Sequence, residues 1–249
     1  MSEWDESDAQ LELRLRTWAI PVALASAFFL VWAVPSLVRI FLSMWVHELG
    51  HATTAWMCGY LAFPGPWLTP TASRQSLLFE LLVLGALGFG VFRAFRQERP
   101  GLARALIAVA ALQLFCAALL GPARQRQLIV FMGDGGCLVI GTLLMLSIYT
   151  RSAAQGWLRW GFLGIGAAAF ADAFSLWWAA RHDADRIPFG MNEGAGLSDP
   201  SVLSEGFGWS ANMLVHRYVA LGCVCLAVLA SVWLLGVVRA RRAVSASTA

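Results

Sequence analysis

The chain has 249 residues, of which 59% are hydrophobic and only 13% are charged. Soluble domains carry about 25% charged residues, so this composition excludes an ordinary water-soluble globular domain. The formal net charge of +3 is small, and the basic residues are scattered over short connections, which excludes a nucleic-acid-binding protein.

Seven apolar runs, separated by turns that contain Pro and Gly, are long enough to be membrane helices. They cover residues 18–34, 36–58, 76–95, 102–120, 128–149, 157–180 and 213–238. A helix needs about 20 mostly apolar residues to cross the hydrocarbon core of a bilayer. The sequence therefore predicts an all-α fold, a polytopic transmembrane bundle of about six to seven helices. The first two runs could also form one helix that is kinked at Pro35.

The chain is expected to form a single membrane domain with short polar ends. Residues 1–17 are acidic and are predicted to be a solvated tail or a short surface helix. Residues 18–239 are predicted to be the membrane bundle, and residues 240–249 a basic C-terminal tail. Small residues cluster at 85–90 and 161–169, and because small side chains let membrane helices approach closely, we expect packing faces there.

The arginines give a prediction of orientation. The arginines around residues 93–104 and those at 239–242 are four predicted spans apart, and the positive-inside rule places both groups in the cytoplasm. Counting back three spans puts the N-terminus outside, together with the connection 181–212. Arg14 and Arg16 favour the opposite orientation of the N-terminus.

The second run contains the motif H-E-x-x-H, formed by His47, Glu48 and His51. Positions i and i+4 share one face of a helix, so both imidazoles can bind one Zn²⁺. Glu48 is then the predicted catalytic residue, a general base that activates a zinc-bound water. Two of the four histidines fall in this motif, deep in an apolar run where ionisable groups are costly. The alternative is a buried histidine pair that is hydrogen-bonded to Glu48 and to neighbouring helices.

A catalytic zinc site needs a third protein ligand and one open position. The predicted third ligand is Asp134, which lies between two glycines near the start of the fifth run. Asp172, deep in the sixth run, is an alternative ligand, or it could bind a ligating imidazole from the second shell. The remaining alternatives are Glu80 at the start of the third run, Cys137 one turn after Asp134, and His216 at the start of the last run.

These residues resemble a known family. The segment His47-Glu48-Leu49-Gly50-His51 within a membrane helix is similar to the active-site helix of the site-2 protease family of membrane zinc metalloproteases. The segment Gly133-Asp134-Gly135-Gly136 is similar to the downstream Asp-Gly motif of that family. The resemblance implies that His47, His51 and Asp134 bind zinc, that Glu48 is the base, and that the substrates are peptide bonds in or near membrane segments of other proteins.

The resemblance covers two short motifs, and the chain departs from the family pattern in two ways. Family members usually have Leu before the Asp, where this chain has Gly133. They usually place one membrane helix between the two motifs, whereas two runs, 76–95 and 102–120, intervene here. This chain is therefore interpreted as a divergent member.

Two other functions stay open. The first is a non-enzymatic membrane protein that keeps zinc as a structural or sensing element. The second is a transporter that uses Glu80, Asp134 and Asp172 as an ion relay. Under the protease hypothesis the partners are a membrane protein substrate and the lipid bilayer. The short loops suit a bacterial cytoplasmic membrane.

Overall fold

The computed structural model describes residues 3–149, 157–192 and 196–247. Six of the helices in this described part are long and apolar enough to cross a membrane. They are residues 13–33 of α1 (Glu3–Ala33), α4 (Leu77–Arg96), α5 (Pro100–Leu114) with η2 (Phe115–Leu119), α6 (Pro122–Leu146) with η3 (Ser147–Tyr149), α7 (Leu158–Ala180) and residues 211–242 of α9 (Ala211–Ser247). The chain is an integral membrane protein of the all-α class, as predicted.

The predicted second span folds as a helix in three sections. They are α2 (Pro35–Val38), the π-helical turn η1 (Arg39–Ser43) and α3 (Met44–Met57). The preceding Val34 has φ −142° because a residue before proline is displaced from the helical region, so α1 and α2 are separate helices. The section is not among the six apolar helices of the described chain, since Arg39 and the motif residues make it too polar.

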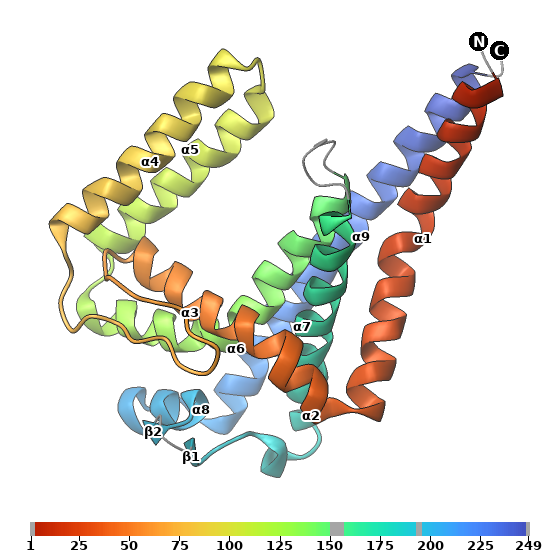
Figure 1. Cartoon of the computed structure of the whole chain (residues 1–249). Coiled ribbons are helices and arrows are strands. Elements are labelled where there is room, and N and C mark those ends of the chain that lie inside the picture. The colour runs from red at the N-terminus through yellow and green to blue at the C-terminus, as the bar shows by residue number, and fades with distance from the viewer. Residues whose placement is uncertain (1–2, 150–156, 193–195, 248–249) are drawn as a thin grey trace. The chain divides into compact units, whose positions relative to one another are not determined.

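Contacts divide the described part of the chain into two compact units. The first unit comprises Met1–His47, Asp134–Pro188 and Trp209–Ala249, and the second comprises Glu48–Gly133 and Phe189–Gly208. In the first unit α1, α7 and α9 pack against one another. Figure 1 shows α1 and α9 side by side, with the beginning of α1 next to the end of α9.

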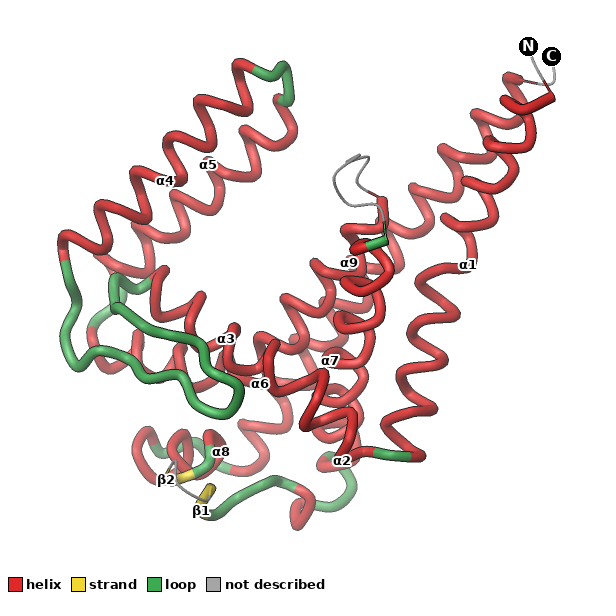
Figure 2. Tube along the Cα trace, in the orientation of Figure 1, coloured by secondary structure: helices red, strands yellow, loops and turns green. Residues whose placement is uncertain are grey.

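The second unit is built on an antiparallel hairpin of α4 and α5 (Figure 1). Ser76 caps α4, where its hydroxyl accepts a hydrogen bond from the amide of Phe79. The long connection between α3 and α4 folds back on itself through a bridge between Ala62 and Thr71 (Figure 2). Ala62 of this connection belongs to an apolar core that also includes Ala52 and Ile129.

The segment after α7 adds small elements to both units. The 3-10 turn η5 (Ala184–Arg186) ends the part that belongs to the first unit. The two-residue strands β1 (Met191–Asn192) and β2 (Gly196–Leu197) then form an antiparallel pair in the second unit. The short helix α8 (Asp199–Ser201) and the π-turn η6 (Val202–Gly206) follow β2.

Candidate metal centre

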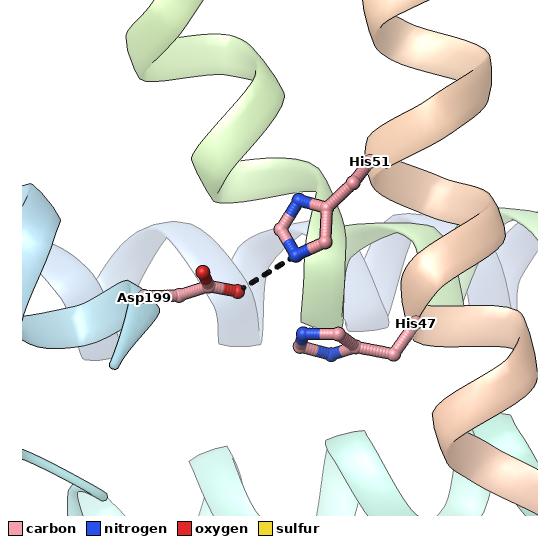
Figure 3. Close-up of side chains that lie close together, drawn as sticks. All are labelled: His47, His51 and Asp199. Carbon is pink, nitrogen blue, oxygen red and sulfur yellow. Dashed lines mark ion pairs between the residues drawn. The ribbon is translucent and has the colours of Figure 1, made fainter. Parts of the chain in front are cut away.

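The H-E-x-x-H motif lies within α3, as the sequence predicted. His47 and His51 are one helical turn apart, and both imidazoles project from the same side of the helix (Figure 3). His47 and Glu48 are buried, and His51 is partly buried. Glycine is the poorest helix former apart from proline. The single Gly50 does not end the helix, because α3 continues to Met57.

His47 is held by the carboxylate of Asp134. Nδ1 of the imidazole lies 3.0 Å from Oδ1 of Asp134. The indole Nε1 of Trp177 donates to Oδ2 of the same carboxylate at 2.8 Å. Both carboxylate oxygens of this buried residue therefore have hydrogen-bond partners. The structure thus brings the predicted ligand Asp134 to His47, on the Nδ1 side of the ring.

Arg39 joins the two aspartates that the sequence singled out. Its Nη2 donates to Oδ1 of Asp134 at 3.2 Å, and its Nη1 donates to Oδ2 of Asp172 at 3.0 Å. Asp172 thus contacts a guanidinium, where the sequence suggested contact with zinc or with an imidazole. The charge of Arg39 explains how two carboxylates can be buried in one membrane-embedded unit.

His51 is held by two oxygen atoms of the second unit. The backbone carbonyl oxygen of Ile129 lies 2.7 Å from Nδ1. The carboxylate oxygen Oδ2 of Asp199 lies 3.1 Å from Nε2 (Figure 3). Asp199 begins α8 and is about one-quarter exposed, with a side-chain exposure of 24%.

Glu48 is positioned by the connection that follows α3. The hydroxyl of Thr69 lies 2.7 Å from Oε2 of Glu48 and 3.0 Å from its backbone carbonyl oxygen. The Thr69 hydroxyl thus lies between the carboxylate and the backbone carbonyl of Glu48, and it holds the carboxylate in one direction. A general base needs such a fixed direction to meet the proton that it accepts.

The donor chemistry of these side chains fits zinc. Two imidazoles and a carboxylate are a ligand set found in catalytic zinc sites. Ligating histidines usually donate their second ring N–H to a carboxylate or a backbone carbonyl. Asp134 beside His47 and Ile129 beside His51 supply one acceptor of each kind.

One group of side chains that could hold a metal ion lies entirely inside the first unit. Ligand atoms of His47, Asp134 and Cys137 lie within 4.8 Å of one another. However, the thiol of Cys137 lies 3.7 Å from the hydroxyl of Ser43, and Asp134 already binds the cationic Arg39. A guanidinium at this position repels a divalent ion, so this group fits zinc less well.

The two remaining alternative ligands lie elsewhere in the fold. Glu80 lies in the first turn of α4, close to Gly59. His216 lies on an exposed position of α9. The five cysteines are free thiols.

Sequence reasoning missed three residues of the centre. Arg39 was detectable in principle, because a charged side chain inside an apolar run is a functional candidate. Asp199 and Thr69 lie in connections, where acidic residues and hydroxyls are common. No signal in the sequence distinguishes these two residues from their neighbours.

The comparisons with known proteins add no relative. No protein-family model, no curated protein and no solved structure matches this chain.

Proposed function

We propose that this protein is a zinc metalloprotease that hydrolyses peptide bonds in or near membrane segments of protein substrates. The arrangement of α3 carries the proposal: His47 and His51 project from one side of the helix, and each has an oxygen acceptor at Nδ1. That arrangement directs Nε2 of both rings toward a shared ligand. A buried histidine pair without a metal would not need this matched pattern.

The residues of the centre have distinct tasks. His47 and His51 would hold the zinc ion, which supplies Lewis acidity to water and to the scissile carbonyl group. Glu48 follows His47 directly and accepts the proton of the attacking water. It then donates this proton to the leaving amine. Thr69 holds the Glu48 carboxylate in place through its hydroxyl.

The substrate class follows from the surroundings of the centre. Six apolar helices place the chain in a lipid bilayer, where the accessible substrates are other membrane segments. An amide in an intact membrane helix is shielded by its own hydrogen bonds, so the substrate must unwind locally. We propose a bacterial cytoplasmic membrane as the location, with a membrane protein as the substrate.

Zinc content and peptide cleavage test this proposal together. The probe is a fluorescent single-span peptide, rich in Leu and Ala, with a central Asn-Gly that weakens its helix. Protein purified in detergent should bind about one zinc per chain and cleave the probe. Glu48→Gln should keep the zinc and lower cleavage by roughly 10²–10⁴-fold, because it lacks the base.

Glu205→Gln is the matched control, since Glu205 is an exposed carboxylate. It should match the unmodified protein in zinc content and in rate. Cleavage that survives in Glu48→Gln would remove the proposed role of Glu48. Zinc binding without cleavage by the unmodified protein would favour the non-enzymatic zinc protein.

A further inference from the structure

The imidazole of His51 faces oxygen atoms on both sides. A backbone carbonyl only accepts hydrogen bonds, so the Nδ1 atom next to Ile129 carries the hydrogen. In the neutral ring Nε2 then presents its lone pair, and it faces Oδ2 of Asp199 at 3.1 Å (Figure 3). Two lone pairs at this distance are stable only with a cation between them, which is either a proton or a metal ion.

The distance between these two atoms suits zinc. Zinc–nitrogen and zinc–oxygen bonds of about 2.0–2.1 Å in a tetrahedron separate neighbouring ligand atoms by about 3.3 Å. The observed separation of 3.1 Å between Nε2 and Oδ2 is close to this value. His51 and Asp199 therefore have the spacing of adjacent ligands of one metal ion.

Asp199 is held in place by its neighbours. The hydroxyl of Ser201 accepts a hydrogen bond from the amide of Gly190 at 2.8 Å and lies 3.1 Å from the hydroxyl of Ser198. Ser198, Pro200 and Ser201 are buried, so the backbone on both sides of Asp199 is anchored. Such support positions a ligand before the metal arrives.

Asp134 differs from Asp199 because both of its carboxylate oxygens already have partners that a metal ion would displace. Its Oδ1 accepts from Arg39 and faces Nδ1 of His47, and its Oδ2 accepts from Trp177. Binding zinc would displace these partners and bring the ion close to a guanidinium. A carboxylate with these contacts can instead orient an imidazole, by accepting the N–H that the metal does not use.

We propose that Asp199 is the carboxylate ligand of the zinc ion held by His47 and His51, and that Asp134 is a positioning residue for His47. This inference rests on the proposed function, because it assumes that the two histidines of α3 bind zinc. It reverses the assignment that the family resemblance implies for Asp134. It also gives the segment after β2 a direct role at the centre.

Zinc affinity distinguishes the two aspartates. The full-length protein in detergent is titrated with zinc against a competing chelator. Asp199→Ala removes a ligand and should weaken zinc binding by at least 100-fold. Asp134→Asn keeps an oxygen acceptor for His47 and should cost about tenfold, the low end of the effect of changing a residue that orients a ligating histidine. Glu205→Ala, which removes an exposed carboxylate of the same segment, should bind zinc like the unmodified protein.

A cysteine exchange reports ligation directly. A thiolate bound to Co²⁺ gives an intense near-ultraviolet charge-transfer absorption. Co²⁺ added to Asp199→Cys should give this absorption above the background of the unmodified protein, which has five cysteines of its own. Asp134→Cys should not. This readout does not depend on catalysis or on the stability of the variants relative to each other, provided that each binds Co²⁺.

Different results would contradict the assignment of Asp199 and the proposed function. Zinc binding by Asp199→Ala at the affinity of the unmodified protein would overturn the assignment. So would a thiolate absorption from Asp134→Cys that is missing from Asp199→Cys. Undiminished zinc binding by His47→Ala would instead contradict the metal site of α3, and with it the proposed function.

Discussion

At the scale of single residues, Arg39 has the clearest energetic role. Its guanidinium donates to Asp134 and to Asp172, and its side chain is 30% exposed. Removing one partner of a buried ion pair leaves the remaining charge uncompensated. Arg39→Met should therefore lower the free energy of unfolding by about 2–3 kcal/mol, a value reduced for the partial exposure of the arginine. Denaturation in mixed SDS and detergent micelles measures this quantity.

A second variant separates charge from packing. Adding Asp172→Asn to Arg39→Met removes one of the two stranded charges and should recover part of the lost stability. The matched control is Arg74→Met, because Arg74 is an exposed arginine of the connection before α4. It should unfold like the unmodified protein. If Arg39→Met unfolds like Arg74→Met, the ion pairs do not stabilise the fold.

The residues of the candidate centre were predictable where the signal was local. The spacing of His47 and His51 is a property of one helix, and so the sequence alone placed them on a common face. The contacts of Arg39 join residues that are 95 and 133 positions apart, and no local pattern encodes them. Sequence reasoning accordingly singled out Asp134 and Asp172 without finding the arginine that links them.

At the scale of elements, turn chemistry set most helix boundaries. Pro100 begins α5 and Pro122 begins α6, as expected for a residue that favours the first helical turn. It was harder to predict which small residues of a segment make a close contact with another helix. In the small-residue segment 161–169, Gly161 and Gly164 face open space, whereas Gly166 meets the backbone of Gly141 in α6.

The close crossing of α6 and α7 leaves no room for a side chain at position 166. A Cβ atom at position 166 would lie 2.6 Å from the carbonyl oxygen of Gly141 and 2.8 Å from Cβ of Leu144. Gly166→Ala should lower the free energy of unfolding by about 1–3 kcal/mol, because the helices must separate. Gly164→Ala should be neutral or slightly stabilising, since alanine favours helix. Equal stability of the two variants would contradict the close crossing.

At the scale of the whole molecule, composition and run length were sufficient for the all-α membrane class and for a count of six to seven spans, of which the described residues contain six. Run length treated residues 36–58 as a seventh span. The structure divides this run at η1, and its polar side chains engage Asp134, Asp172 and Asp199. Hydropathy alone does not show whether a helix of mixed polarity crosses the membrane or instead carries the polar residues of a site without crossing. The difference of one span reverses the predicted side of the N-terminus.

The first unit therefore leads to a prediction of topology. The indole Nε1 of Trp233, in the C-terminal half of α9, donates to the carbonyl oxygen of Thr17, in the N-terminal half of α1, at 3.0 Å. Helices joined at these positions have the start of α1 and the end of α9 at the same membrane face (Figure 1). The six apolar helices of the described residues, an even number of crossings, also return the chain to the side where it begins. The positive-inside rule makes this side cytoplasmic, because it gathers Arg14 and Arg16 with the C-terminal arginines.

Reporter fusions test this orientation in bacterial cells. Green fluorescent protein, which folds in the cytoplasm, should fluoresce when fused to either end of the chain. Alkaline phosphatase, which is active only outside, should be inactive at both ends. Inserted after Asp185, an exposed residue between α7 and α9, the phosphatase should be active, since one crossing separates this position from the C-terminus. An active phosphatase at the N-terminus with an inactive one at the C-terminus would restore the seven-span topology, and it would require the helix of His47 and His51 to cross the membrane.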